Sequence, residues 1–207
     1  FTIHSYKIYQ RNEGRVRMEY GKFILAGEDK KTLATIKNAL VASGHIFTGY
    51  SKEPYNILRH IRNLTPDLVI IEVGNNFREL RNTLDVIDEE ILAACILVLE
   101  SRNEDVFHFL RNSRVMTYIT KPVFDEVVAQ IADIVLMNYS RVLEYENKVK
   151  KLNDTLESRK VVEKAKWILV EQQKISESEA YEIIKKKSRD NRLPMREIAE
   201  AIILTRG

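Results

Sequence analysis

Residues 67–72 read Asp-Leu-Val-Ile-Ile-Glu, four apolar side chains in succession followed by a glutamate. A strand that is buried on both faces needs apolar residues at every position, because successive side chains point to opposite faces of the sheet. Further short runs of this kind lie before and after it in the chain, at 22–26, 45–47, 95–99 and 115–119. These five runs predict a five-stranded parallel sheet.

Between these runs, apolar residues return at helical spacing. Leu33, Ile36 and Leu40 share one helical face, and Ser43-Gly44 supplies a stop. Strands that alternate with helices form a doubly wound α/β domain, whose ligands bind at the carboxyl ends of the strands. We therefore expect a flavodoxin-like α/β domain over residues 22–123.

Composition excludes several classes of protein. The chain has 207 residues, 44% hydrophobic and 30% charged, which argues against a disordered chain. The single cysteine, Cys95, lies inside an apolar run, so no intramolecular disulfide can form and no thiolate metal site is expected. No apolar stretch approaches the ~20 residues needed to cross a bilayer, so we expect a cytoplasmic protein with no membrane partner. Residues 1–21 form an N-terminal extension to which no function is assigned.

The chain contains no glycine or proline between Pro122 and Pro194. A helix from about residue 125 to 173 would be roughly 70 Å long at 1.5 Å per residue. Its apolar residues recur at every seventh position, and they are Val128, Val135, Val142, Val149 and Leu156. Valine at the a positions of a heptad favours a parallel two-stranded coiled coil. We assign 124–152 to a coiled-coil helix whose seam forms a homodimer; the alternative is an amphipathic helix packed on its own domain.

Residues 153–207 are predicted to be entirely helical. Ser176 and Glu179 have the spacing of a capping box, and Pro194 suits the first turn of a further helix. Together with the end of the long helix, these two helices form an all-α three-helix module. Six Lys and Arg lie between Lys185 and Arg196 against Asp190 alone. Such density can neutralise nucleic-acid phosphates, although a solvated surface is the alternative.

Four separated stretches of this module are 156–159, 163–169, 176–181 and 191–199. In this order they resemble the ANTAR family, three-helix RNA-binding modules of bacterial transcription antiterminators. Trp167 departs from the family, which usually has glycine after Ala-Lys; we expect its ring to pack in the helical core, with stacking on an unpaired base as the alternative. The resemblance and the charge predict RNA contacts from Arg159, Lys160, Lys166, Trp167, Lys185, Arg189, Arg192 and Arg196.

The polar residues at the predicted strand ends resemble the receiver domain of bacterial response regulators. Lys121-Pro122 follows the fifth strand, as in that family, and Tyr118 stands at the position of its switch aromatic. The resemblance implies two acidic residues that bind Mg²⁺ after the first strand, a phosphoaccepting Asp after the third, and a Ser or Thr at the end of the fourth.

This chain departs from that pattern at each acidic or hydroxyl position. Gly27 replaces the first acid, Glu28 stands at the second, Glu72 replaces the phosphoacceptor, and Glu100 replaces the hydroxyl residue. Phosphoryl transfer needs a carboxylate in line with the donor and a metal to neutralise charge. We therefore expect Glu28, Glu72, Glu100 and Lys121 to form a degenerate phosphoacceptor site without metal or cofactor. Glu72 either mimics the phosphorylated state by pairing with Lys121 or belongs to a decayed site kept as a scaffold.

These observations predict a pseudo-receiver regulator that dimerises and binds hairpin loops in nascent leader RNA, so that transcription continues. No enzyme activity is expected, because the four histidines have no metal-ligand or triad spacing and no Gly-rich phosphate loop is present. The signal could come from a regulatory protein that binds the pseudo-receiver. The alternative is a protein-interaction adaptor that uses the pseudo-receiver and the coiled coil without binding RNA.

Overall fold

The computed structural model describes residues 20–74 and 77–206, and the chain divides into two compact units between Leu143 and Glu144. Most of the predicted N-terminal extension, residues 1–19, lies outside the described residues. In the part of the chain that the structure describes, no helix is long and apolar enough to cross a membrane.

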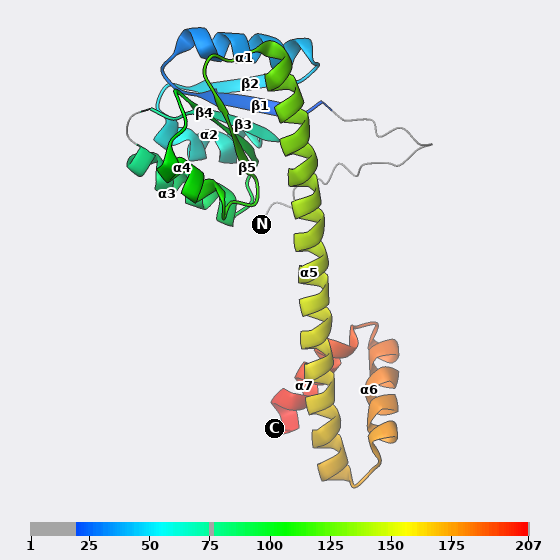
Figure 1. Cartoon of the computed structure of the whole chain (residues 1–207). Helices are drawn as coiled ribbons and strands as arrows, with labels where there is room; N and C mark the ends of the chain where they lie inside the picture. Colours follow the sequence, from blue (N-terminus) through cyan, green and yellow to red (C-terminus); the bar gives the residue numbers. More distant parts are fainter. Residues whose placement is uncertain (1–19, 75–76, 207) are drawn as a thin grey trace. The chain divides into compact units, whose positions relative to one another are not determined.

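The first unit is a parallel sheet with helices on both faces (Figure 1). Its strands are β1 (Lys22–Ala26), β2 (Ile46–Ser51), β3 (Leu68–Glu72), β4 (Ala94–Leu99) and β5 (Met116–Thr120). They follow the order β2-β1-β3-β4-β5, and each neighbouring pair is parallel. The predicted doubly wound α/β domain is confirmed.

The central strand β3 shows why every position of such a strand must be apolar. Val69 and Ile71 belong to the core on the face covered by α2 (Ile57–Leu64), α3 (Phe77–Glu89) and α4 (Glu104–Leu110), with the short helix η1 (Pro54–Asn56) before α2. Leu68 and Ile70 belong to the opposite core, covered by α1 (Lys30–Ala42) and the beginning of α5 (Asp125–Gln173). Glu72 is the exception, and it stands at the carboxyl end of the strand.

The beginning of α5 is part of the α/β core. Val128 and Val135 are 1% and 3% exposed and pack with Ala132 in the core that α1 covers. The prediction that these two valines line a dimer seam is wrong, because the chain's own core already buries them. The α/β unit thus continues beyond residue 123, and the apolar side chains exposed on this part of α5 include Val127 and Ile134.

The second unit consists of the C-terminal part of α5 with α6 (Glu177–Asn191) and α7 (Met195–Arg206). The three helices share one small core, formed by Ala165, Leu169, Ala180, Ile184, Ile198, Ala199 and Ile202. The predicted capping box begins α6: Oγ of Ser176 accepts a hydrogen bond from N–H of Glu179, whose carboxylate accepts one from N–H of Ser176. The predicted three-helix module is therefore present.

Candidate functional site

Four charged side chains meet at the carboxyl ends of β1, β3, β4 and β5. Nζ of Lys121 donates hydrogen bonds to Oδ2 of Asp29 at 2.9 Å, to Oε1 of Glu72 at 2.7 Å and to Oε1 of Glu100 at 2.5 Å. The parallel sheet explains the meeting, because it brings the ends of these strands to one edge. Glu72, Glu100 and Lys121 are thus assembled as predicted.

Glu72 is held at both of its carboxylate oxygens. While Oε1 pairs with Lys121, Oε2 accepts hydrogen bonds from the backbone N–H of Glu28 at 2.7 Å and of Asp29 at 2.8 Å. Glu28 therefore joins the site through its backbone, whereas its side chain is exposed. The contribution expected from its carboxylate comes from Asp29 instead.

Asp29 is a site residue that the sequence analysis missed. Its Oδ1 accepts hydrogen bonds from the backbone N–H of Lys31 and Thr32, so that it caps the first turn of α1. Its Oδ2 accepts from the hydroxyl of Thr32 at 2.6 Å and from Lys121. An aspartate directly before a predicted helix was the available signal, and the cap fixes its carboxylate beside Lys121.

Hydrogen bonding shifts the pKa values of Lys121, Glu72 and Asp29 more than burial does. Burial lowers the pKa of Lys121, but its hydrogen bonds to Glu100, Glu72 and Asp29 raise that pKa to well above its ordinary value. Burial acts to raise the pKa of Glu72, and hydrogen bonds from Lys121 and from two backbone N–H groups bring it below the ordinary value. The pKa of Asp29 is lowered chiefly by the Thr32 hydroxyl and by Lys121. Asp29, Glu72 and Lys121 are therefore ionised at neutral pH.

The glycine at position 27 leaves room for the longer side chain of Glu72. Gly27 has φ of +152°, and a Cβ there would lie 2.5 Å from Cβ and 2.6 Å from Oε2 of Glu72. A larger side chain at position 27 would leave no room for Glu72 as it lies here. Gly27 and Glu72 therefore fit each other sterically.

This geometry favours an internal ion cluster over phosphoryl transfer. In-line attack needs a carboxylate oxygen that faces the donor, and both oxygens of Glu72 already accept hydrogen bonds. Within residues 20–74 and 77–206, no group of three or more His, Cys, Asp or Glu is placed to hold a metal ion.

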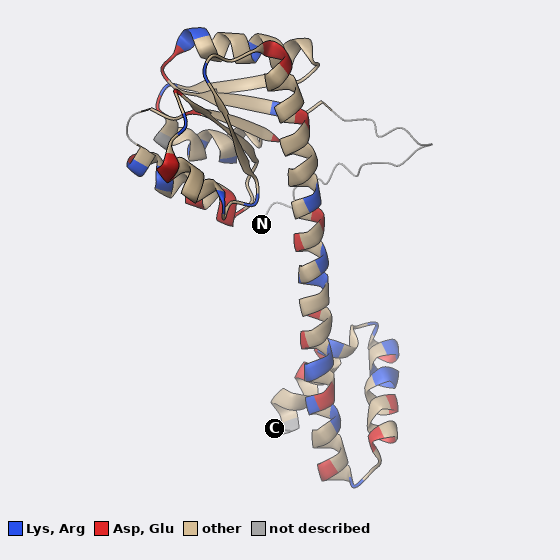
Figure 2. Ribbon diagram, viewed as in Figure 1, with Lys and Arg blue, Asp and Glu red and all other residues tan. Residues whose placement is uncertain are grey.

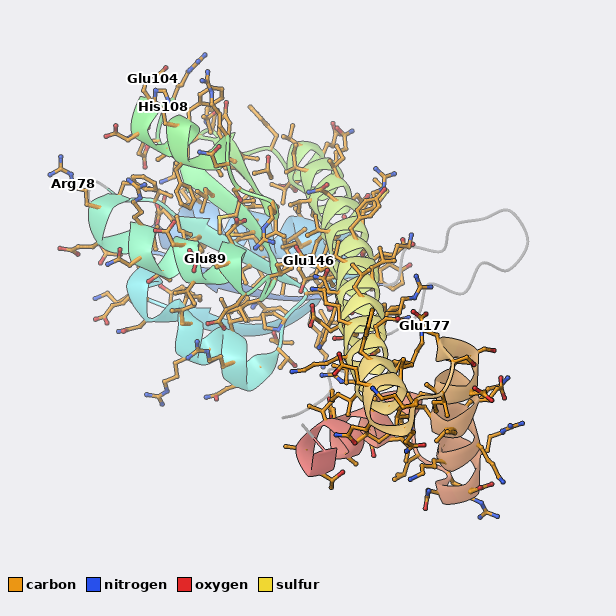
Figure 3. All side chains as sticks on the ribbon, turned by 90° about the horizontal axis from the view of Figure 1, so that it is seen from below. Arg78, Glu89, Glu104, His108, Glu146 and Glu177 are labelled. Atoms are coloured by element: carbon orange, nitrogen blue, oxygen red, sulfur yellow. The ribbon has the colours of Figure 1, made fainter. Side chains whose placement is uncertain are left out.

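The predicted switch aromatic packs against α4. The half-buried ring of Tyr118 stands edge-on to Phe107, with 6.5 Å between the ring centroids. The guanidinium groups of Arg102 and Arg111 lie 5.0 and 5.2 Å from the centroid of Phe107. Figure 3 marks α4 by Glu104 and His108. Tyr118 thus belongs to a small aromatic and cationic cluster on α4 and β5.

The second unit carries a group of exposed basic side chains near the connection between α6 and α7. Figure 2 shows acidic residues at the beginning of α6 and basic residues toward its end. We call the exposed members the basic cluster, and they are Lys186, Lys187, Arg189 and Arg192. Arg159 on α5 is exposed as well.

Other predicted RNA contacts are paired with carboxylates of their own helix. Lys160 pairs with a glutamate at 2.7 Å, Lys185 at 3.0 Å and Arg196 at 2.8 Å. Exposed pairs of this kind are weak, worth about 0.3–0.5 kcal/mol on a helix, so they can exchange for phosphate.

Lys166 is held more firmly than these residues. Its Nζ lies 2.9 Å from Glu163 on α5 and 3.6 Å from Glu177 on α6, and its side chain is only 12% exposed. Hydrogen bonding to Glu163 raises the pKa of Lys166. Figure 3 labels Glu177 at the beginning of α6. The structure therefore gives Lys166 a role in joining two helices of the module.

Trp167 does not pack in the core of the module. Its side chain is 60% exposed, whereas Ala165 and Leu169 on the same helix are buried. The expectation of core packing is wrong, because the ring lies on the opposite side of α5 from the residues that contact α6 and α7.

Comparisons with known proteins agree with both halves of this description. Residues 150–203 match the family model of the ANTAR domain. The chain is 26% identical over 142 residues to the transcriptional regulatory protein PdtaR from two strains of Mycobacterium tuberculosis, and the match covers 69% of each protein.

Two solved structures share the fold of the first unit. NtrX from Brucella abortus, in complex with ADP, has a TM-score of 0.54 and 15% identity, over 70% of this chain and 35% of that one. The signal receiver domain of a modulated diguanylate cyclase from Desulfovibrio desulfuricans G20 has a TM-score of 0.50 and 15% identity, over 59% of this chain and 98% of that one. The chain therefore combines a receiver-fold α/β domain with a C-terminal ANTAR domain, and it is homologous to PdtaR.

Proposed function

We propose that this protein is a dimeric regulator of transcription antitermination that binds hairpin loops in nascent leader RNA. The ANTAR domain and the homology to PdtaR support an RNA-binding antitermination regulator. The observation that carries the proposal is the basic cluster of the ANTAR unit. Its four cations lie within seven residues of chain, at the end of one helix and in the connection to the next.

The basic cluster has the chemistry of a phosphate-binding surface. Basic residues at a helix C-terminus also stabilise the helix dipole, but one or two charges suffice for that role. Four exposed cations exceed this need and would release counterions on binding RNA. Single-stranded loops are the expected target, because side chains read unstacked bases more readily than the narrow major groove of A-form RNA.

Dimerisation would place two such clusters on one RNA. The part of α5 within the second unit carries four large apolar side chains at a and d positions of the heptad, each more than half exposed: Tyr145, Val149, Leu152 and Leu156. A parallel coiled coil would bury them. Two linked modules raise the affinity for a two-hairpin RNA through effective concentration. Of the five predicted seam residues, we therefore retain Val149 and Leu156 in the proposed dimer seam. Val142 is half-buried.

The receiver domain would act without phosphorylation. Its lysine already binds carboxylates of the same chain, so the signal has to arrive by another route. A regulatory protein that binds the pseudo-receiver is the partner we propose.

The test is a titration of a labelled two-hairpin leader RNA with the full-length protein, beside an RNA with scrambled loops. We expect tight binding to the first RNA only, with affinity that falls steeply as salt rises. Arg189→Ala and Arg192→Ala should each reduce the slope of log affinity against log salt by about 0.7. Lys30→Ala, an exposed lysine on α1, is the matched control and should leave the slope unchanged.

Equal and weak binding to both RNAs by a well-folded dimer would contradict this function. The protein-interaction adaptor would then be the better description.

A further inference from the structure

A cavity of about 350 Å³ lies at the carboxyl end of β2, the strand at one edge of the sheet. It extends from the last residues of β2 across η1 to α2, and we call it the β2–α2 cavity. Its lining consists of Tyr50, Ser51, Lys52, Glu53, Asn56, Arg59 and His60. Ligands of α/β sheets bind at the carboxyl ends of the strands, in cavities of about 300 Å³ or more. The β2–α2 cavity therefore has the position and the volume of a site for one small ligand.

Two basic side chains of the β2–α2 cavity have no partner of their own. Lys52 and Arg59 are exposed, and within the described part of the chain neither makes an ion pair or a side-chain hydrogen bond. The lining contains one carboxylate, that of Glu53, which already accepts a hydrogen bond from Nδ2 of Asn56 at 2.6 Å. Two unpaired cations against one carboxylate give the lining a net positive charge, which attracts an anion.

The imidazole of His60 in the same lining also lacks a partner. Its ring nitrogens make no hydrogen bond to the described residues, and Nδ1 is nevertheless buried. Among residues 20–74 and 77–206, it is the one buried side-chain nitrogen or oxygen without a hydrogen bond. Buried polar atoms nearly always have a partner, so an exception indicates that a bound group supplies it. Because no hydrogen bond holds the ring, His60 can direct an N–H group at an anion in the cavity.

Tyr50 supplies an aromatic surface beside these cations. Its side chain is 41% exposed, and its hydroxyl donates a hydrogen bond to the carbonyl oxygen of Gly27 at 2.6 Å. This hydrogen bond holds the ring in place at the cavity. Nucleobases stack on aromatic side chains, because every base has a π face. An aromatic ring beside two cations therefore has the chemistry that recognises a nucleotide.

We propose that the β2–α2 cavity binds a mononucleotide. Lys52 and Arg59 hold its phosphate, to which His60 donates a hydrogen bond. The ring of Tyr50 stacks on its base. Asn56 precedes α2 without capping it, and the first turn of α2 has no acidic residue, so the helix dipole also favours an anion there. This inference goes beyond the proposed function, because it requires neither RNA nor a dimer.

Gly27 connects the β2–α2 cavity to the ion cluster of Lys121. In addition to accepting from Tyr50, Gly27 donates a hydrogen bond from its N–H to the carbonyl oxygen of Ser51 at 3.1 Å. Gly27 also lies directly against the side chain of Glu72. A nucleotide on Tyr50 would thus contact the residue that holds the backbone beside Glu72. The pseudo-receiver would then have a small-molecule input in addition to the proposed regulatory protein.

Calorimetric titration of the full-length protein with AMP, GMP, CMP and UMP tests the inference. We expect at least one of them to bind, and adenosine, ribose 5-phosphate and inorganic phosphate to bind about tenfold more weakly or worse. Lys52→Ala and Arg59→Ala should each weaken nucleotide binding about tenfold at unchanged melting temperature, because both residues are exposed. Arg62→Ala is the matched control: it lies one turn further along α2, pairs with Glu90 and does not line the cavity.

The aromatic ring is tested separately. Tyr50→Leu should weaken nucleotide binding about tenfold and leave the binding of ribose 5-phosphate unchanged, because only a base contacts the ring. Tyr50→Phe loses the hydrogen bond to Gly27 but keeps the ring, so it should retain most of the affinity for the nucleotide.

Several outcomes would overturn the inference. The absence of binding by all four nucleotides would do so, as would binding that Lys52→Ala and Arg59→Ala leave unchanged in the folded protein. Equal affinity for inorganic phosphate and the nucleotide would exclude a role for the base, and equal affinity for adenosine would exclude a role for the phosphate. None of these results bears on the RNA titration, because the residues of the β2–α2 cavity lie outside the basic cluster.

Discussion

Nζ of Lys121 lies 2.7 Å from Oε1 of Glu72, so the lysine that follows β5 binds a carboxylate of its own chain. Gly27 makes this pairing possible, because any side chain there would meet Glu72. The domain thus has the receiver fold, and Glu72, which the sequence analysis expects at the phosphoacceptor position, serves as an internal anion for Lys121.

Gly27→Ala should destabilise the α/β unit by about 2 kcal/mol, because the backbone has positive φ and the new Cβ would meet Glu72. Urea unfolding, followed through hydrogen exchange of the strand amides, measures the change. Gly74→Ala is the matched control, since a Cβ there meets nothing within 4 Å. Equal stability of the two variants would show that Gly27 is dispensable.

The stability of the α/β unit should fall in acid. Because the pKa of Glu72 is lower in the folded state, its contribution is complete above the ordinary value of about 4.3 and is lost as the pH falls through the folded pKa. Unfolding measured between pH 2 and pH 7 should show this loss. Glu72→Gln cannot titrate at this position, so its stability should depend less on pH in that window; an unchanged profile would place the acid sensitivity elsewhere.

The receiver domain should not accept phosphate from small donors. Both oxygens of Glu72 are occupied by hydrogen bonds, and Glu100 places a further negative charge beside Lys121. Intact mass after incubation with acetyl phosphate and Mg²⁺ should be unchanged. A stable adduct that disappears in Glu72→Gln would contradict this prediction.

Lysine substitutions at two heptad positions of α5 should have different effects. Val135→Lys places a charge in the α/β core and should lower the stability of that unit by several kcal/mol. Leu152→Lys changes an exposed side chain and should leave both units folded while it weakens the dimer. Thermal unfolding and sedimentation separate these effects. A monomer that remains fully stable in the Val135 variant would restore the seam predicted from the heptad alone.

Substitutions of two basic residues of the ANTAR domain should affect its stability and its RNA binding differently. Lys166→Ala removes the link between α5 and α6 and should lower the melting temperature more than it weakens RNA binding. Arg192 ends α6 with φ of 54°, so Arg192→Gly should raise the melting temperature by relieving the left-handed backbone and should weaken RNA binding. If both variants lost RNA binding equally at unchanged stability, Lys166 would be an RNA contact after all.

The sequence predicted those features in which one pattern has one structural solution. The apolar run before Glu72 has to be a central strand, and the capping box at Ser176 has to begin a helix. The heptad has two structural solutions, because Val135 would fit equally well in a dimer seam or in a core against the chain's own sheet. Only the tertiary packing shows that it lies in the core.

Two other differences also depend on geometry that the sequence does not specify. The backbone turn after β1 directs Asp29 rather than Glu28 at Lys121. Lys166 acquires Glu177 as a partner only once α6 folds back along α5. In both cases the partner of the residue depends on how the elements pack, and the sequence pattern alone does not determine it.

The carboxylate of Glu72 is a permanent part of the chain, and this affects how long it can stay bound to Lys121. An acyl phosphate on an aspartate is lost by hydrolysis, so the phosphorylated state of a receiver has a limited lifetime. The carboxylate that Lys121 binds here is attached through carbon–carbon bonds and is present for as long as the polypeptide exists. This carboxylate therefore lasts as long as the protein itself. If the proposed function holds, synthesis, degradation or a competitor for Lys121 would set how long a response lasts.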